Sequence, residues 1–273
     1  MRIKDILITL WVVISGVLLF GIIVFLISFI FLKGYRVIDL EFIVGVPKGD
    51  ILGVEGGIAP AIIGSFLSTG IATLISSILA LGTAIYLNFY EKNRKIIEIV
   101  SFVIKCIGGV PSIVIGLFGY TVFTYYLGLG RSIIAGSLTL GIMIFPAIEL
   151  KIDKLFKEVD RNIIYSSYSL GVSKSYTIIK VILSLCKEEI ISALSLGYAY
   201  AIGATAPIMF CMAVLNSPIS FNITKPTMTL SYHLYILITQ GISEKMAYGT
   251  AVILLAMIIL IIVFSRFIIR KRG

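Results

Sequence analysis

Lys105 is the side chain with the clearest potential for chemistry, because it is the fully charged residue that lies well inside a long apolar stretch. It follows the start of that stretch by about nine residues, so a helix would place it about 14 Å from the end. Burying a charge in lipid is costly, so Lys105 is either a functional residue or one that snorkels to the interface. The sole histidine, His233, is expected in an external loop and has no acidic neighbour in sequence.

No group of residues in the sequence resembles an enzyme active site. The chain lacks the G-x-x-x-x-G-K-[ST] loop that binds ATP phosphates, and it lacks the zinc motif H-E-x-x-H. Its three cysteines are scattered, which argues against a zinc site or a disulfide framework. We therefore expect a protein that is not an enzyme and that holds no metal or cofactor of its own.

The composition is that of a membrane protein. Hydrophobic residues make up 59% of the chain and charged residues only 14%, too few to cover a soluble domain. The net charge is +9, but the basic residues lie between and after the apolar stretches, so we expect no nucleic-acid partner. Six stretches can cross about 30 Å of hydrocarbon. They predict an all-α polytopic membrane protein with six transmembrane helices near Ile6–Leu32, Ala59–Phe89, Ile96–Leu127, Ser132–Glu149, Ile190–Leu215 and Ala247–Phe267.

Lysine and arginine residues are divided unequally between the two sides of these spans. Most lie near the chain ends, between the second and third spans, and in the segment Leu150–Glu189. Cytoplasmic loops carry the excess of basic residues, so we expect both termini and this segment to be cytoplasmic. The Gly-rich segment Lys33–Ile58 is then external.

The segment Leu150–Glu189 is the longest cytoplasmic stretch, and its pattern predicts short helices. We expect one helix over Lys154–Leu170, ended by Gly171. Ser173 is a suitable cap for a further helix that starts at Lys174. An insertion of this kind is either a docking platform or a solvated connector.

Two prolines interrupt predicted spans. Pro111 follows two glycines in the third span, and Pro207 lies in the fifth. Neither can donate a hydrogen bond to the carbonyl four residues earlier, so the carbonyls of Ile107 and Gly203 need other partners. Such breaks are either packed kinks or irregular backbone that lines a wet cavity.

The second span carries a small residue at every fourth position. These positions form one ridge along a helix, which lets another helix approach closely. Close packing explains the ridge, and the ridge does not by itself indicate transport. It consists of Gly64, Ser68, Ala72, Ser76, Ala80 and Ala84.

Several stretches resemble the permeases of type I ABC importers, specifically the phosphate permeases of the PstA type. They run from Gly56 to Leu87, from Gly109 to Tyr120, from Leu170 to Lys174 and from Ala201 to Pro207. The resemblance implies a MetI-like permease core over residues 56–273, with a coupling loop at about residues 150–189. Residues 1–55 would form an N-terminal transmembrane helix and an external loop.

In such importers the long cytoplasmic loop carries the motif E-A-A-x-x-x-G, whose short helix docks on an ATPase subunit. The glycine is retained here, whereas a tyrosine replaces the glutamate and serines replace both alanines. The resemblance therefore implies a docking helix with altered contacts. Its ATPase-coupling residues would be Tyr165, Ser166, Ser167, Leu170 and Gly171.

Phosphate permeases usually carry R-A-x-G-E-T-A-P in the fifth span. Here Tyr200 occupies the arginine position and Ala204 the glutamate position, while Thr205 is retained. A dianion needs fixed positive charge or oriented N–H donors, so the lost arginine weakens the case for phosphate. We expect a pathway beside the two broken spans, with Lys105 as the replacement charge. Its candidate residues are Lys105, Ser112, Tyr200 and Thr205.

We interpret the chain as the permease subunit of an ATP-driven importer for phosphate or a related oxyanion, in the plasma membrane of a prokaryote. The resemblance implies a homologous permease, two ATPase subunits that bind the ATP, and an extracytoplasmic substrate-binding protein as partners, besides membrane lipid. One alternative is a divergent structural or regulatory permease whose partner chain carries the substrate contacts. Another is a secondary transporter, which should show paired membrane-embedded charges or an inverted repeat.

Overall fold

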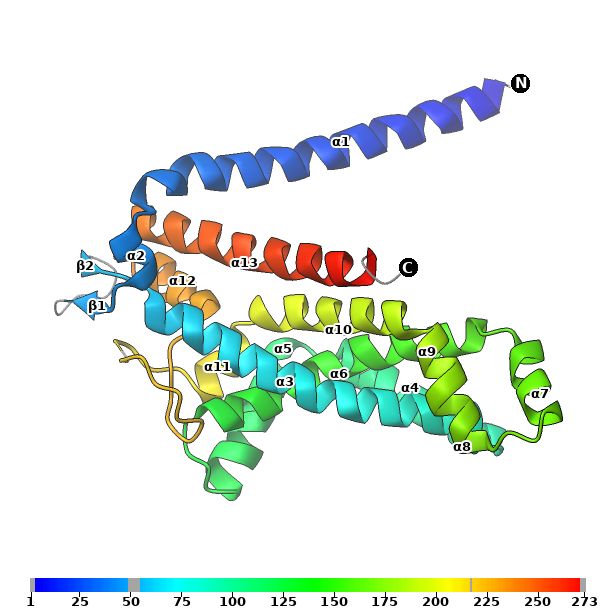
Figure 1. The fold of residues 1–273 in the computed structure, drawn as a ribbon. Helices are drawn as coiled ribbons and strands as arrows, with labels where there is room; N and C mark the ends of the chain where they lie inside the picture. Colours follow the sequence, from blue (N-terminus) through cyan, green and yellow to red (C-terminus); the bar gives the residue numbers. More distant parts are fainter. Residues whose placement is uncertain (1–2, 49–54, 217, 271–273) are drawn as a thin grey trace.

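The computed structural model describes residues 3–48, 55–216 and 218–270, which are mostly helical (Figure 1). The long helices are α1 (Ile3–Gly34), α3 (Ala59–Ile85), α4 (Arg94–Gly109), α6 (Ile133–Glu158), α10 (Lys187–Ile202) and α13 (Glu244–Arg270). The shorter helices are α2 (Leu40–Val44), α5 (Ser112–Gly119), α7 (Arg161–Ser169), α8 (Lys174–Tyr176), α9 (Leu183–Leu185), α11 (Ala206–Cys211) and α12 (Leu230–Thr239). A 3-10 turn, η1 (Tyr35–Val37), and three π-helical segments, η2 (Tyr86–Tyr90), η3 (Tyr120–Tyr126) and η4 (Thr177–Ile182), extend or join them. Strands β1 (Pro47–Lys48) and β2 (Glu55–Gly56) pair antiparallel.

The apolar helices make the chain an all-α, multi-pass membrane protein. Four single segments are long and apolar enough to cross a membrane: those formed by α1, by α3 with η2, by α6 and by α13. The third predicted span is a bent pair, in which α4 and the α5–η3 segment meet at 99°. The fifth predicted span is divided between α10 and α11. Because α10 has 16 residues, it is shorter than the about 20 that a straight span requires.

Helices α3 and α6 pack along each other and form the centre of the bundle. The small-residue ridge predicted on α3 is confirmed, since all of its members are buried. A Cβ added at Gly141 of α6 would lie 3.4 Å from the carbonyl oxygen of Ala72 on α3. On another side of α6, Ile148 packs directly against Gly197 of α10. Small residues thus let α3 and α10 both approach α6 closely.

The predicted external loop Lys33–Ile58 is folded over its described residues. Asp39 caps α2, because its Oδ1 accepts a hydrogen bond from the backbone N of Phe42 at 2.7 Å. Phe42 is only 3% exposed and packs in an apolar cluster that includes Ile58 and Leu230. This cluster connects the segment before α3 to α12.

His233 is not in an external loop, and that prediction is wrong. It lies on α12 and is 2% exposed. Its Nδ1 is 3.0 Å from Oγ1 of Thr250 on α13. The apolar residues around His233 form one more helix that packs against α13, so the histidine is a buried link between two helices.

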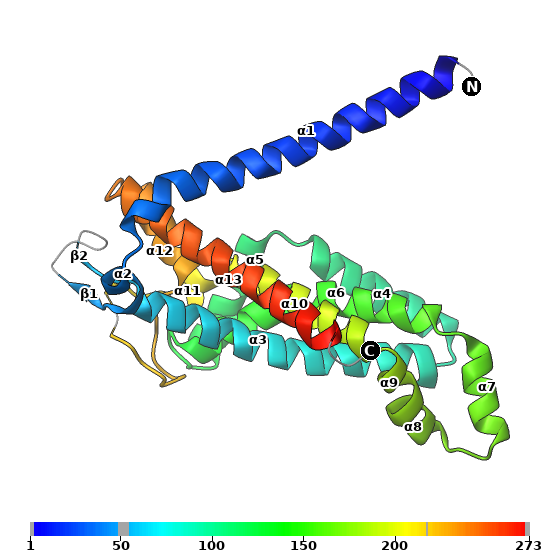
Figure 2. The same cartoon turned by 45° about the horizontal axis from the view of Figure 1, so that its top comes forward.

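Helix α1 lies apart from the rest of the bundle and contacts α13 and η1 (Figure 2). Phe29 packs edge-on against Tyr248, with ring centroids 5.9 Å apart, and Gly34 lies directly against the backbone of Tyr248. Nearer the start of α1 the large apolar side chains are exposed, and Trp11 is 73% exposed. Lipid or a second membrane protein must cover such a surface.

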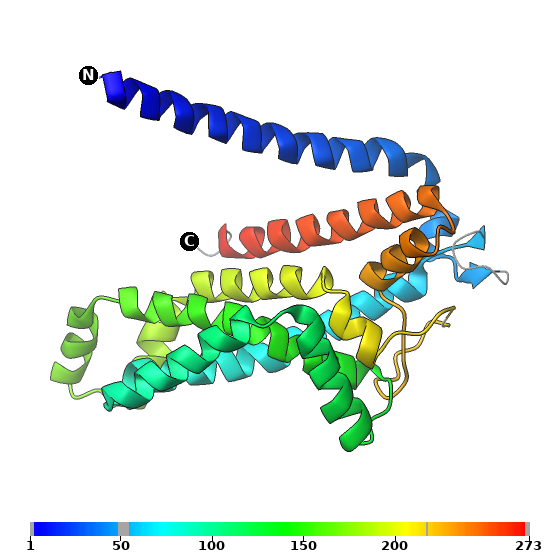
Figure 3. The same ribbon diagram turned by 180° about the vertical axis from the view of Figure 1, so that it is seen from behind.

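The two ends of the bundle differ in structure. Helix α1 begins and α13 ends at the same end as α7, α8 and α9, which we name the α7 end (Figures 1 and 3). The β1–β2 pair, α2 and α12 lie at the opposite end. The arrangement groups both ends of the described chain with the segment Leu150–Glu189, as the basic residues predict.

Candidate functional site

The candidate coupling segment projects from the bundle as α7 (Figure 1). Helix α6 continues to Glu158, and Asp160 then starts α7 by accepting a hydrogen bond from the backbone N of Asn162 at 2.9 Å. The prediction of one helix over Lys154–Leu170 is therefore wrong. The chain turns at Val159 and Asp160 because the Asp160 side chain caps a new helix.

Gly171 ends α7 in the left-handed conformation, with φ +74°. The backbone N of Gly171 donates to Tyr168 O at 2.9 Å, and that of Val172 donates to Ser167 O at 3.3 Å. These two bonds form a Schellman cap, which confirms that the position favours glycine. Ser173 then caps α8 as predicted, since its Oγ accepts from the backbone N of Tyr176 at 3.4 Å.

Most of the predicted coupling residues are exposed. Tyr165 is 59% exposed and Leu170 is 82% exposed, and Ser166 and Gly171 are also on the surface. Ser167 is buried instead, and its Oγ donates to the carbonyl oxygen of Ile163 at 2.9 Å. The structure therefore gathers four of these five positions on a projecting turn that a partner can contact.

A pocket of about 730 Å³ is lined by η2, the start of α4, the end of α6, α7 and α8. Phe89 and Phe156 form part of its apolar wall, with ring centroids 5.3 Å apart. Lys174 lies with its Nζ 4.4 Å from the ring centroid of Tyr90. The pocket gives the α7 end a positive lining from Arg94, Lys157, Arg161 and Lys174.

The turn between η2 and α4 is held by Glu91. Its Oε1 accepts hydrogen bonds from the backbone N of Lys92 at 2.9 Å and of Asn93 at 2.7 Å, and Tyr86 donates to its Oε2. These bonds, led by that from Tyr86, hold the pKa of Glu91 below its ordinary value. The turn thereby fixes the start of α4 beside the pocket.

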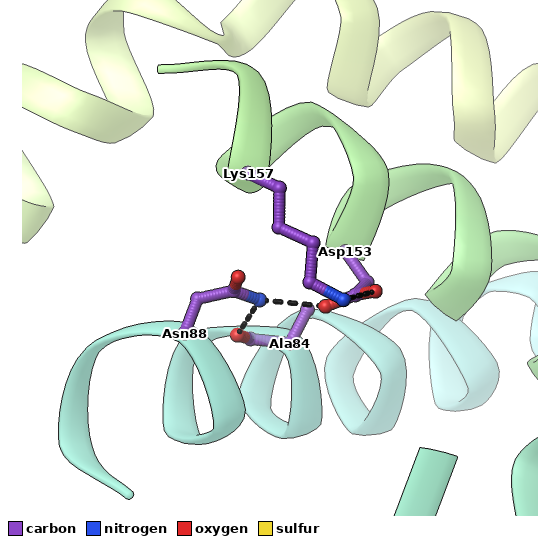
Figure 4. Close-up of polar contacts among 4 residues, drawn as sticks. All are labelled: Ala84, Asn88, Asp153 and Lys157. Carbon is purple, nitrogen blue, oxygen red and sulfur yellow. Dashed lines mark hydrogen bonds and ion pairs between the residues drawn. The ribbon is translucent and has the colours of Figure 1, made fainter. Parts of the chain in front are cut away.

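A buried polar link that the sequence analysis missed joins α3 to α6 near this pocket (Figure 4). Nδ2 of Asn88 donates to the carbonyl oxygen of Ala84 at 2.9 Å and to Oδ1 of Asp153 at 2.8 Å. Nζ of Lys157 donates to Oδ2 of Asp153 at 2.6 Å. Asp153 is only 9% exposed, and each of its two carboxylate oxygens accepts a hydrogen bond from within the protein, as a buried polar group requires.

The two backbone breaks lie close together through the packing of α5 on α11. A Cβ added at Gly116 would be 3.0 Å from the carbonyl oxygen of Ala206. Ser112, one turn before Gly116, begins α5 and is exposed, whereas Thr205 precedes α11 and is half-buried. At the first break, the backbone N of Val110 donates to Ile107 O at 3.1 Å, which satisfies the carbonyl that Pro111 leaves free.

Lys105 and Tyr200 flank α6 from opposite sides. Lys105 is one turn before Gly108, which packs on Pro146 of α6. Tyr200 is one turn after Gly197, which packs on Ile148 of α6. Pro146 and Ile148 are two residues apart on α6, so their side chains point about 200° apart around the helix axis. Helices α4 and α10 therefore lie on opposite faces of α6. Both side chains are exposed, and no ion pair of Lys105 occurs among the described residues.

A helical membrane bundle with two broken spans and a capped helix projecting from one end has the architecture of a transporter permease. The sequence profile of the family "Binding-protein-dependent transport system inner membrane component" matches residues 72–271. The chain belongs to this family, whose members are transport subunits, and it is the permease subunit of an ABC importer.

Two relatives illustrate the range of the similarity. The probable ABC transporter permease protein YqgI of Bacillus subtilis is 27% identical over 260 residues, which are 90% of this chain and 87% of that protein. The PstA homolog of the phosphate transport system of Mycoplasma pneumoniae is 30% identical over 266 residues. These cover 93% of this chain but only 39% of that protein. The resemblance to PstA-type permeases is therefore confirmed.

Among solved structures, the methionine ABC transporter MetNI in an inward-facing conformation has a similar fold. The TM-score is 0.67, and the match covers 77% of this chain and 94% of that chain. At 14% sequence identity this likeness concerns the fold alone.

Proposed function

We propose that this chain forms half of the gated pathway of an importer for phosphate or a related oxyanion, and that α7 transmits the closure of an ATPase subunit to it. The observation that carries the proposal is the exposed turn around Gly171, at the position that the family uses for coupling. The glycine has the left-handed conformation that fixes this turn. PstA-type relatives support an oxyanion as the substrate.

The proposed assembly contains a homologous permease, two ATPase subunits and an extracytoplasmic binding protein in a prokaryotic plasma membrane. The α7 end would be cytoplasmic, because basic residues concentrate on it. Exposed Leu170 and Tyr165 offer apolar and aromatic contacts in place of the usual glutamate and alanine. The ATPase groove that receives α7 should accordingly be less basic than that of other members.

An anion pathway in this chain would depend on Lys105 rather than on Tyr200. Tyr200 can donate a hydrogen bond but carries no charge at neutral pH. Lys105 is exposed on α4 without an ion pair among the described residues, so its charge is available to a passing anion. The break at Pro111 lies less than two turns further along the chain.

A divergent subunit is the second candidate, and the loss of charge at Tyr200 and Ala204 favours it. In that case the partner permease would supply the cation that an oxyanion needs. The two candidates differ in whether the charge of Lys105 affects uptake.

The test is ATP-dependent uptake of radiolabelled phosphate by liposomes that contain the chain, its genomic partner permease and ATPase, and the loaded binding protein. We expect uptake that needs ATP and that falls in the variant Lys105→Met. Uptake at the parental rate in Lys105→Met would refute this role of Lys105 and favour the divergent-subunit alternative. An assembled, ATP-hydrolysing complex that imports neither phosphate, sulfate nor molybdate would refute the oxyanion assignment.

A further inference from the structure

Glu149 is a buried carboxyl group in the middle of α6. It is 1% exposed, and its Oε1 has no hydrogen-bond partner among the described residues. The predicted fourth span ended at this residue, but α6 continues through Glu158, so Glu149 does not mark the end of the helix. A buried acceptor without a partner is costly, and it therefore indicates a ligand or a proton that is not among the protein atoms.

The position of Glu149 on α6 places it in the seam with α3. Asp153 is four residues further along α6 and bonds to Asn88, and Phe156 is seven residues further along and packs on Phe89. Residues spaced by four and seven share one face of a helix. Glu149 therefore faces α3, one turn before the polar link in Figure 4.

The other neighbour of Glu149 along this face is apolar. Phe145, one turn earlier on α6, lines a pocket of about 740 Å³ together with Leu79 and Thr83 of α3. The remaining lining residues are almost all aliphatic or aromatic. Glu149 thus lies at the boundary between an apolar pocket and an ion pair whose hydrogen bonds are already satisfied.

The charges around Glu149 leave one negative charge without a counterion if both carboxyl groups ionise. Asp153 and Lys157 are the charged residues four and eight positions further along the same face of α6, and Nζ of Lys157 is bonded to Asp153 at 2.6 Å. Helix α3 contains no titratable side chain, and Tyr86 of η2 is bonded to Glu91. On α10, Ser192 accepts a hydrogen bond from Lys151 of α6. On α4, Glu98 pairs with Arg94, and Lys105 is exposed and makes no ion pair among the described residues. Cys211 of α11 is bonded to Thr139 and Gly116, and α5 has no titratable side chain.

We propose that Glu149 is a proton-binding site in the α3–α6 seam, which holds a proton while the two helices are packed and releases it when water enters between them. Asp153 then carries the single negative charge, balanced by Lys157. A proton removes the cost of a buried, unpaired carboxylate without needing the ring of oxygen ligands that a metal cation requires. The described residues contain no group of three or more histidine, cysteine or acidic side chains that could hold a metal ion.

The test is modification of the full chain in liposomes by the apolar reagent dicyclohexylcarbodiimide. The reagent reacts with a protonated carboxyl in apolar surroundings: the O–H adds across one C=N bond, and acyl transfer to nitrogen gives a stable N-acylurea with no leaving group. We expect the peptide that contains Glu149 and Asp153 to gain one reagent mass at neutral pH, with fragmentation placing it on Glu149. Labelling should fall to background at alkaline pH and in Glu149→Gln.

A second measurement decides the case in which the reagent does not reach the seam. If Glu149 holds a proton only when folded, the melting temperature in detergent should fall as the pH rises above about 4.3, where the unfolded carboxyl loses its proton. The fall should level off once the folded protein has lost the proton too, and Glu149→Gln should flatten this dependence. The amide has the shape of the protonated acid, so this variant should fold. Reagent found on Asp153 alone would overturn the proposal, and so would equal pH dependence of wild type and Glu149→Gln. Protection from labelling by sodium chloride but not by choline chloride would also overturn it, in favour of a metal-cation site.

Discussion

The turn at Gly171 permits a matched test of coupling, because a turn of the same geometry lies at the opposite end of the bundle. Gly241 has φ +62°, and its backbone N donates to Ile238 O at 3.2 Å. The backbone N of Ile242 donates to Leu237 O at 3.1 Å, which completes a second Schellman cap. A Cβ at either glycine would have no heavy atom within 4 Å, so a side chain there meets backbone strain and no clash.

The expected cost of Gly171→Val or Gly241→Val follows from the backbone alone. A left-handed conformation costs a residue with a side chain about 1–2 kcal/mol, and valine lies at the upper end because it is β-branched. A cost of this size lowers the population of the closed turn by about 5- to 30-fold. Both variants should therefore weaken their turns equally and leave the α3–α6 core folded.

The two variants should differ only in coupling. Each would be expressed with its partner permease and ATPase and purified in detergent, and two quantities would be measured: the ATPase retained on the column and the hydrolysis stimulated by loaded binding protein. We expect Gly171→Val to lose most of both and Gly241→Val to retain both. Equal losses in the two variants would show general destabilisation, and parental coupling in Gly171→Val would refute the role of α7.

Three further predictions concern packing, the polar link and the pathway. Gly64→Ala would place a Cβ directly against the backbone oxygen of Met228 and should cost about 1–3 kcal/mol. Gly70→Ala meets no atom within 4 Å and should stabilise α3 by about 0.5–1 kcal/mol. Both changes would be measured by thermal unfolding in detergent. Asp153→Ala should lower the melting temperature clearly more than Lys154→Ala, whose ion pair with Glu158 is exposed. Breaking a fully buried ion pair costs about 3–5 kcal/mol of stability. The stability lost in Asp153→Ala should be smaller, because the Lys157 side chain is 56% exposed. Lys105→Met should reduce phosphate uptake while Tyr200→Phe leaves it near the parental rate.

The sequence predicted those features of the fold that depend on local properties. Runs of apolar residues located the long helices α1, α3, α6 and α13, and the small-residue ridge of α3 identified the face that is buried. Pro111 and Pro207 located the two breaks because proline removes a backbone donor wherever it occurs. Gly171 and Ser173 were recognised by their fit to a helix end and a helix start.

Features that depend on distant partners could not be predicted. The predicted fourth span ended at Glu149, whereas α6 continues to Glu158 with Glu149 and Asp153 both buried. The contact that allows Asp153 to be buried comes from Asn88, 65 residues earlier. His233 was placed in a loop because it lies between the fifth and sixth predicted spans. Its hydrogen-bond partner Thr250 lies on another helix, α13. The spacing of Glu149, Asp153 and Lys157 by four residues was the one local sign of a shared helix face.

The placement of Lys105 and Tyr200 limits how one chain can contribute to a pathway. A pathway formed with a second permease must lie on one face of α6, because the α3–α6 seam is filled by side chains. Lys105 belongs to the face covered by α4 and Tyr200 to the face covered by α10. The broken backbone of α4 and α5 lies on the first face, together with the exposed Lys105, so an anion pathway is expected there. Comparable losses of uptake in Lys105→Met and Tyr200→Phe would show that this separation of the two faces is wrong.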